Sequence, residues 1–125
     1  MRRLLVIDDH DDIRENIAEI LALAGYEVFT APNGKRGVEI ALKEKPELVI
    51  CDIMMPELDG YATTEAIRNM PQFADLPIIT VTAKAMKGDR EKAIASGATD
   101  YITKPVDTGH LLAVMRKCLE RAAAR

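Results

Sequence analysis

Five side chains able to support acid, metal or phosphoryl chemistry each stand at the end of a short apolar run. They are Asp8 and Asp9, Asp52, Thr82 and Lys104. Two carboxylates about 4 Å apart repel by roughly 4 kcal/mol at an effective dielectric constant near 20, so three clustered acids need a cation or a proton. Carboxylate oxygens without His or Cys partners suit a hard ion, and Mg²⁺ in particular shares its coordination shell with phosphate. The set predicts Mg²⁺-dependent phosphoryl transfer.

The apolar runs that precede these side chains alternate with helical patterns along the whole chain. The expected strands cover residues 4–7, 27–30, 48–51, 78–81 and 101–103. Between them and after the last one, apolar residues recur at helical spacing. Strands separated by helices predict a parallel sheet covered on both faces. In such sheets the ligand site lies beyond the carboxyl ends of the strands, where the five side chains would meet.

Local signals define the ends of these helices. Asp11 and Asn33 are expected to cap helix N-termini, and Gly25 and Gly97 stand where helices end. Asp8 and Asp9 could serve the same capping role, but Asp11 and its neighbour already provide it. Two acids are therefore in excess of what capping needs.

Composition excludes several classes of protein. The chain has 125 residues, of which 48% are hydrophobic and 30% charged, which predicts one globular domain with one core. A net charge of −3 and no dense run of basic residues give no reason to expect direct nucleic-acid binding. No apolar run is long enough for a signal segment or a membrane span, so a cytoplasmic location is expected. Cys51 and Cys118 are expected to be reduced core residues.

Four motifs in order give the chain a resemblance to the receiver domain of two-component response regulators. They are VIDDH (6–10), CDIMMPELDG (51–60), VTAK (81–84) and ATDYITKP (98–105). The resemblance covers essentially all of residues 1–125, which are therefore expected to form a single receiver domain. It implies an α/β, flavodoxin-like, doubly wound sheet of five parallel strands in the order 2-1-3-4-5, with five helices.

The resemblance also implies a role for each site residue. Asp52 would be the nucleophile that accepts a phosphoryl group from a phosphohistidine. Lys104 would pair with Asp52 and then with the phosphoryl oxygens, and its bond to Pro105 would be cis. Asp9 would bind Mg²⁺ directly and Asp8 through water, while the backbone carbonyl of Met54 would complete the protein ligands. Read without the resemblance, Asp52 serves only the following turn and Lys104 is a solvated loop lysine.

The same resemblance implies a switch and two tuning residues. The Thr82 hydroxyl would move to the new phosphoryl group and Tyr101 would rotate inward, which changes the surface of the fourth helix, last strand and fifth helix. Met54 and Lys84 stand where relatives tune the lifetime of the phosphoryl group. Met54 cannot orient an attacking water, so a persistent phosphoryl form is expected. Ile13 lies where relatives dock phosphotransfer helices, although its helical phase favours burial.

Partners and rival functions follow from these expectations. The partners would be a histidine kinase or histidine phosphotransfer protein and a downstream protein, with the chain a monomer or a phosphorylation-dependent dimer. It would be free-standing or part of a larger regulator or hybrid kinase, and not a multiple-turnover enzyme. Flavodoxins need a phosphate cradle where this chain has DDHDD, and haloacid-dehalogenase-type phosphohydrolases need an acid where it has Met54. A degenerate receiver that only binds partners is the remaining alternative.

Overall fold

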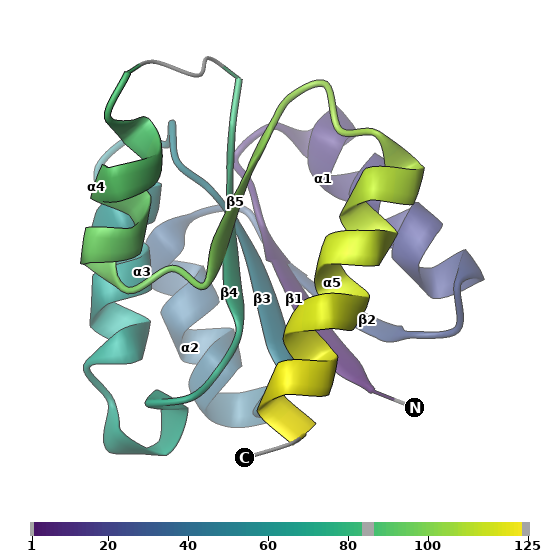
Figure 1. The fold of residues 1–125 in the computed structure, drawn as a ribbon, viewed down its shortest axis with the longest axis horizontal. Helices are drawn as coiled ribbons and strands as arrows, with labels where there is room; N and C mark the ends of the chain where they lie inside the picture. Colours follow the sequence, from purple (N-terminus) through teal and green to yellow (C-terminus); the bar gives the residue numbers. More distant parts are fainter. Residues whose placement is uncertain (1, 84–86, 124–125) are drawn as a thin grey trace.

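A parallel sheet of five strands forms the centre of the molecule in the computed structural model, which describes residues 2–83 and 87–123 (Figure 1). The strands are β1 (Arg3–Ile7), β2 (Glu27–Ala31), β3 (Leu48–Asp52), β4 (Ile78–Thr82) and β5 (Asp100–Thr103). Their order across the sheet is β2-β1-β3-β4-β5, and every neighbouring pair is parallel. The predicted doubly wound α/β architecture is confirmed.

Five helices connect and cover the strands. They are α1 (Asp11–Leu23), α2 (Gly34–Glu44), α3 (Gly60–Arg68), α4 (Asp89–Ser96) and α5 (Thr108–Ala123), with a short 3₁₀ turn at Pro71–Phe73. Helices α1 and α5 lie on one side of the sheet in Figure 1, and α2 and α3 lie on the other. The sheet is therefore covered on both faces, as crossovers between parallel strands require.

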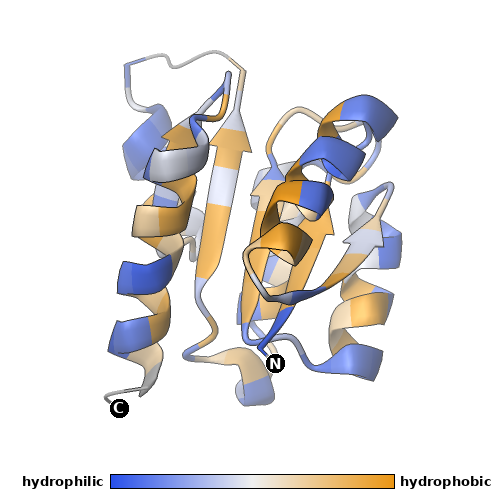
Figure 2. Ribbon diagram, turned by 90° about the vertical axis from the view of Figure 1, so that its right-hand side faces the viewer, coloured by the Kyte–Doolittle hydropathy of each residue, from blue (hydrophilic) through white to orange (hydrophobic). Residues whose placement is uncertain are grey.

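Each face of the sheet has its own apolar layer. Leu4 and Val6 of β1 pack with residues of α1 and α5, whereas Leu5 and Ile7 point to the opposite layer. Because successive side chains of a strand point to opposite faces, a strand covered on both sides needs no polar alternation. The ribbon coloured by hydropathy shows this as orange strands between helices with blue outer faces (Figure 2).

The helix ends agree with the sequence signals except at α1. The Asn33 side chain accepts a hydrogen bond from the Arg36 N–H at 2.8 Å, and Gly97 ends α4 with a φ of 111°. The prediction that Asp11 caps α1 is wrong by one residue, because the cap is His10 and Asp11 is the first helical residue. At the other end of α1, Gly25 follows the C-cap residue Ala24 and has a φ of 99°, a left-handed conformation that favours glycine.

The two ends of the sheet differ in what they carry. The strands point toward the loops that hold the acidic residues, while β1 begins and α5 ends at the opposite end of the sheet (Figure 1). At that opposite end, Arg2 and Ala122 line one cavity. Within the described part of the chain, no helix has the length and apolarity needed to cross a membrane.

Candidate functional site

Strand register brings the buried acids together. Ile7 of β1 pairs with Cys51 of β3, so the next residues, Asp8 and Asp52, lie side by side at the ends of these strands. Strand β3 is one residue longer than expected, and Asp52 is therefore its last residue. Asp8 and Asp52 are each only 2% exposed. Two carboxylates are thus held at adjacent strand ends and out of bulk water.

Lys104 reaches both carboxylates from the end of β5. Its Nζ donates to Asp8 Oδ2 and to Asp52 Oδ1, each at 3.1 Å. The Lys104 backbone N–H donates to the carbonyl of Thr82 at 2.7 Å, which fixes the start of the loop against β4. The peptide bond between Lys104 and Pro105 is cis, which confirms the expectation from the resemblance.

Burial and charge act together on the ionisation of this pair. Burial raises the pKa of Asp52 above its usual value, and the charge of Asp8 raises it further, while Lys104 lowers it in part. Burial alone would lower the pKa of Lys104, but the charges of Asp52 and Asp8 outweigh it and raise that pKa. Lys104 therefore stays protonated. The Asp52 carboxylate binds a proton more readily in the folded chain than in the unfolded chain.

This pKa shift predicts that Asp52→Asn stabilises the fold at neutral pH. A carboxyl group whose pKa is raised on folding contributes stability below its unfolded pKa and loses it as pH rises through the folded value. The melting temperature of Asp52→Asn should therefore exceed that of the parent by several degrees at pH 7, with a smaller gain near pH 4. Thermal unfolding followed by circular dichroism measures both. A gain that is larger at pH 4 than at pH 7 would contradict the assignment.

The acidic cluster has room for a cation. One ligand atom from each of Asp8, Asp9, His10 and Asp52 lies within 4.8 Å of the others. Asp52 Oδ2 is buried and has no hydrogen-bond partner among the described residues. Carboxylate oxygens in this number fit Mg²⁺, so the residues present suit the ion that the resemblance implies.

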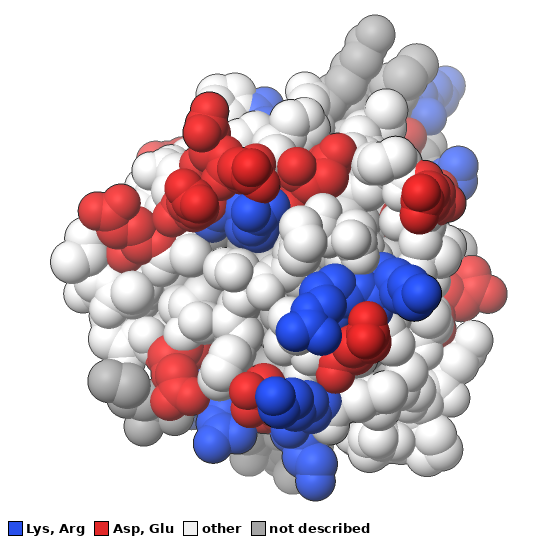
Figure 3. All heavy atoms as spheres, turned by 180° about the vertical axis from the view of Figure 1, so that it is seen from behind, with Lys and Arg blue, Asp and Glu red and all other residues white. Residues whose placement is uncertain are grey.

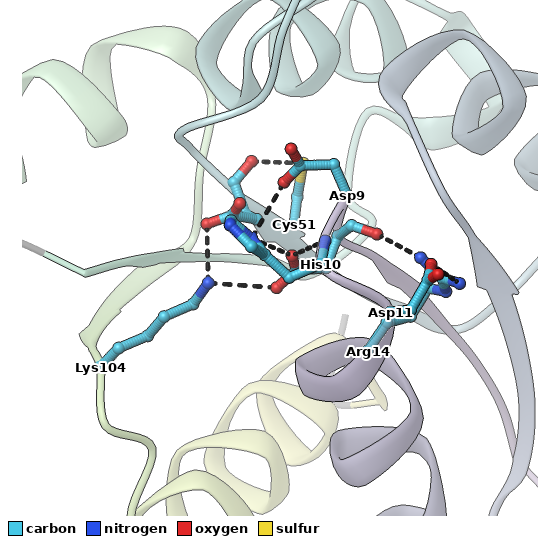
Figure 4. Close-up of polar contacts among 8 residues, drawn as sticks. Asp9, His10, Asp11, Arg14, Cys51 and Lys104 are labelled. Carbon is cyan, nitrogen blue, oxygen red and sulfur yellow. Dashed lines mark hydrogen bonds and ion pairs between the residues drawn. The ribbon is translucent and has the colours of Figure 1, made fainter.

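The expectation that the acids lack a histidine partner is wrong. His10 Nδ1 lies 3.2 Å from Asp8 Oδ1 and 3.1 Å from Asp9 Oδ1. The contact with Asp9 is close without the alignment of a hydrogen bond. His10 caps α1 with an extended backbone, and this conformation turns its ring toward the acids that precede it (Figure 4).

Arg14 is a second residue that sequence reasoning missed. Its guanidinium donates to the backbone carbonyl of Asp8 at 2.8 Å and to Asp11 Oδ1 at 2.6 Å. It therefore ties the first turn of α1 to the loop that carries the acids (Figure 4). The three-residue spacing from Asp11 was the available signal, because residues that far apart face one another on a helix.

The loop after β3 turns away from Asp52 through close backbone packing. The Gly60 N–H donates to the carbonyl of Ile53 at 2.9 Å, and the Asp59 side chain caps α3 by accepting from the Ala62 N–H at 2.8 Å. Met54 lies in this loop with 66% of its surface exposed. Its side chain therefore lies in solvent, two residues after Asp52, rather than in the core.

The remaining predicted residues that the structure describes lie on β4, β5 and α1. Thr82 is the last residue of β4 and is 3% exposed, and Tyr101 is partly buried in β5. Burial, and next the charge of Asp89, raise the pKa of Tyr101. Ile13 packs partly against the core and also lines a groove beside Lys104. Lys84 lies outside the described residues.

The free cysteines behave as expected. Cys51 and Cys118 are both buried and form no disulfide. Burial, and then the charges of Asp52 and Asp8, raise the pKa of Cys51 far above its usual value. Its thiol is therefore a core group beside the site, without the thiolate character that nucleophilic chemistry needs.

Comparisons with known proteins agree with this arrangement. Residues 4–116 match the family model described as the response regulator receiver domain. The transcriptional regulator RpaA of Synechocystis is 36% identical over 121 residues, which is 97% of this chain and 50% of RpaA. The probable transcriptional regulator ycf27 of Porphyra purpurea is 42% identical over 120 residues, 96% of this chain and 48% of that protein.

Solved structures are similar as well. The chemotaxis protein CheY4 of Vibrio cholerae superposes with a TM-score of 0.90 at 30% identity, over 94% of this chain and 98% of CheY4. The chain spans about half the length of the two regulators above but nearly all of CheY4.

Proposed function

Because the chain belongs to the response regulator receiver domain family, we propose that its phosphoacceptor is Asp52 and that the donor is a phosphohistidine. The donor would belong to a histidine kinase or a histidine phosphotransfer protein. The observation that carries this proposal is the joint contact of Lys104 Nζ with Asp8 and Asp52, beside an Asp52 Oδ2 that has no hydrogen-bond partner in the described part of the chain. Residues 1–125 would act together as one receiver domain.

The proposed reaction uses the two oxygens of Asp52 differently. Oδ2 has no hydrogen-bond partner among the described residues and would be the oxygen that binds the cation, which leaves Oδ1 to attack phosphorus. The new bond joins this oxygen to phosphorus, the bond from phosphorus to the donor imidazole breaks, and the imidazole leaves with the electron pair of that bond. Lys104 already donates to Oδ1 and would follow the negative charge onto the phosphoryl oxygens.

A divalent cation would complete the site. Asp8, Asp9 and Asp52 would hold Mg²⁺ together with the backbone carbonyl of Met54 and water. When bound, Mg²⁺ supplies charge neutralisation to the transferring phosphoryl group. Arg14 fixes the loop that carries two of these acids through the Asp8 carbonyl. The acids are thus positioned in advance, and their mutual repulsion favours cation binding.

Intact mass spectrometry tests the proposal directly. The parent chain, incubated with acetyl phosphate and Mg²⁺, should gain the mass of one phosphoryl group, and it should gain none when EDTA replaces the metal. Asp52→Asn should gain none in either condition. Asp12→Asn, an exposed acid in the first turn of α1, is the matched control and should behave like the parent. Phosphorylation of Asp52→Asn at the parent rate would refute Asp52 as the acceptor.

The same samples separate the rival functions. A phosphohydrolase would release phosphate from unrelated phosphate esters over many turnovers, whereas a receiver transfers one group to itself. Met54 stands two residues after Asp52, where such hydrolases need a second acid, which argues against that alternative. A chain that only binds partners would gain no mass in any condition.

Met54 gives a prediction about the lifetime of the phosphoryl group. Its exposed thioether side chain, two residues after Asp52, offers no hydrogen-bond donor to orient an attacking water. Met54→Asn adds an amide that can orient this water, so hydrolysis should become several-fold faster. The decay of the phosphorylated mass after removal of acetyl phosphate measures it. Met54→Leu keeps an apolar side chain and should decay at the parent rate, and equal decay of all three proteins would contradict the proposed role.

The proposed readout is a change in packing near the last two strands. Thr82 and Tyr101 would move together once the phosphoryl group is in place, and α4, β5 and α5 would carry the change to a downstream protein. Burial of Thr82 at the end of β4 supports this, because a movement of a buried side chain changes the packing of its neighbours. The assembly would be a monomer or a phosphorylation-dependent dimer.

Charge and cysteine chemistry support the proposed partners and location. On the face seen in Figure 3, basic side chains lie in small groups beside acidic ones instead of forming one broad basic surface. This supports protein partners rather than direct contact with nucleic acid. Two free cysteines suit a reducing compartment, so the reaction is proposed to occur in the cytoplasm.

A further inference from the structure

His10 lies within the acidic cluster, and the residues on both sides of it in the sequence are aspartates. Its backbone N–H donates to Asp8 Oδ1 at 2.9 Å, and its ring Nδ1 lies 3.2 Å from the same oxygen. The same ring atom lies 3.1 Å from Asp9 Oδ1. The imidazole thus faces the two carboxylates of Asp8 and Asp9, which are proposed to bind a cation (Figure 4).

These separations match those of neighbouring ligand atoms around one metal ion. With bonds near 2.1 Å, adjacent ligand atoms lie about 3.0 Å apart in octahedral coordination and about 3.4 Å apart in tetrahedral coordination. The two ring-to-carboxylate distances, 3.2 Å and 3.1 Å, fall in this range. Asp52 Oδ2 supplies an independent sign of a ligand, because it is buried at the cluster without a partner among the described residues.

We propose that His10 is a metal ligand of this site and that its nitrogen shifts the selectivity of the site from Mg²⁺ toward borderline divalent metals such as Zn²⁺. Imidazole nitrogen is a good ligand for Zn²⁺, whereas Mg²⁺ prefers oxygen and keeps its waters. The inference rests on the proposed function only in placing a cation among Asp8, Asp9 and Asp52. It adds that the identity of the ion depends on His10.

Calorimetric titration of the full chain with Zn²⁺ and, separately, with Mg²⁺ tests this inference. His10→Ala should weaken Zn²⁺ binding by at least about tenfold and change Mg²⁺ binding by less than about threefold, because only Zn²⁺ gains from the nitrogen. His110→Ala is the matched control. His110 is the only other histidine in the sequence, is exposed on α5, and belongs to no metal-binding cluster among the described residues.

Nitrogen NMR of the two imidazoles provides a readout that a structural role would not move. Zn²⁺ should shift the Nδ1 resonance of His10 and leave that of His110 in place. Asp9→Asn should weaken the binding of both Zn²⁺ and Mg²⁺. The inference is overturned if His10→Ala binds Zn²⁺ as tightly as the parent, if the His10 resonance does not move, or if Asp9→Asn leaves Zn²⁺ binding unchanged.

The proposed function is tested separately, by measuring phosphorylation of the parent chain at Asp52. Loss of Zn²⁺ binding in His10→Ala together with phosphorylation of the parent at Asp52 supports both proposals. Unchanged Zn²⁺ binding in His10→Ala, with the parent still phosphorylated, overturns only the role of His10. Absence of phosphorylation in the parent, with the His10-dependent Zn²⁺ binding present, overturns only the phosphoacceptor role and supports His10 as a ligand.

Discussion

Replacing Lys104 with methionine should slow phosphorylation of Asp52 by about two orders of magnitude or more, the usual effect of removing a group that stabilises transition-state charge. Among the described residues, Lys104 Nζ is the cation that contacts both Asp8 and Asp52, each at 3.1 Å. Methionine keeps much of the length of the side chain and removes the charge. Initial rates of mass gain with acetyl phosphate and Mg²⁺ measure the effect, and a rate within a few-fold of the parent would contradict the role of Lys104.

The control for this variant is Lys117→Met, which removes an exposed lysine from α5 and should leave the rate unchanged. Circular dichroism distinguishes lost chemistry from lost folding. Without Lys104, the carboxylates of Asp8 and Asp52 repel at close range, so the variant should unfold more easily at pH 7. Asp8→Asn combined with Lys104→Met removes this repulsion and should recover stability.

The pH dependence of Lys104→Met has a defined sign. The pKa of Asp52 is already raised by burial and by Asp8, and loss of Lys104 removes the charge that opposes this. A raised carboxyl pKa gives stability at low pH that is lost as pH rises. Lys104→Met should therefore regain stability relative to the parent on acidification from pH 7 toward pH 5. A constant difference in unfolding free energy across this range would contradict the electrostatic explanation.

Gly60→Ala should lower the unfolding free energy by about 3 kcal/mol or more, because it forces overpacking against main-chain atoms that cannot rotate away. A Cβ atom on Gly60 would lie 2.2 Å from the carbonyl oxygen of Asp52 and 2.5 Å from the Cα of Ile53. Relief requires β3 and α3 to separate, which would also displace the Asp52 carboxylate. The variant should therefore lose phosphorylation as well as stability.

Gly109→Ala is the matched control for this prediction. A Cβ on Gly109 meets only Asp107 Oδ2 at 3.9 Å, and alanine is a better helix former than glycine. Its stability should equal or slightly exceed that of the parent. Urea unfolding at pH 7 gives both free energies. A Gly60→Ala midpoint near that of Gly109→Ala would show that β3 and α3 separate at little cost.

The fold was predictable because two independent features of the sequence agree. The central strands β1 and β3 are apolar over most of their length without polar alternation, and helical patterns separate all the strands, which together leave few arrangements besides a covered parallel sheet. The polar residues that end these runs were then expected to meet beyond the carboxyl ends of the strands. The structure places Asp8, Asp52 and Lys104 in contact there. Spacing alone sufficed because strand ends, rather than side-chain conformations, decide this meeting.

The details that escaped prediction depend on conformation within loops. His10 is a single residue within an acidic run, and only the extended backbone at the helix cap directs its ring toward Asp8 and Asp9. Arg14 acts on a backbone carbonyl, an atom that every residue has and that no motif marks. The close approach of Gly60 to the Asp52 carbonyl is equally invisible, since glycine before a helix has many ordinary explanations.

The places where β1 begins and α5 ends have a practical consequence. Both lie at the end of the sheet opposite the acids, near the cavity that Arg2 and Ala122 share. A surface linker, a fluorescent protein or a purification tag attached at either end would therefore project away from Asp52. The protein could be immobilised there, or joined to a reporter, while the acidic cluster at the opposite end of the sheet stays uncovered.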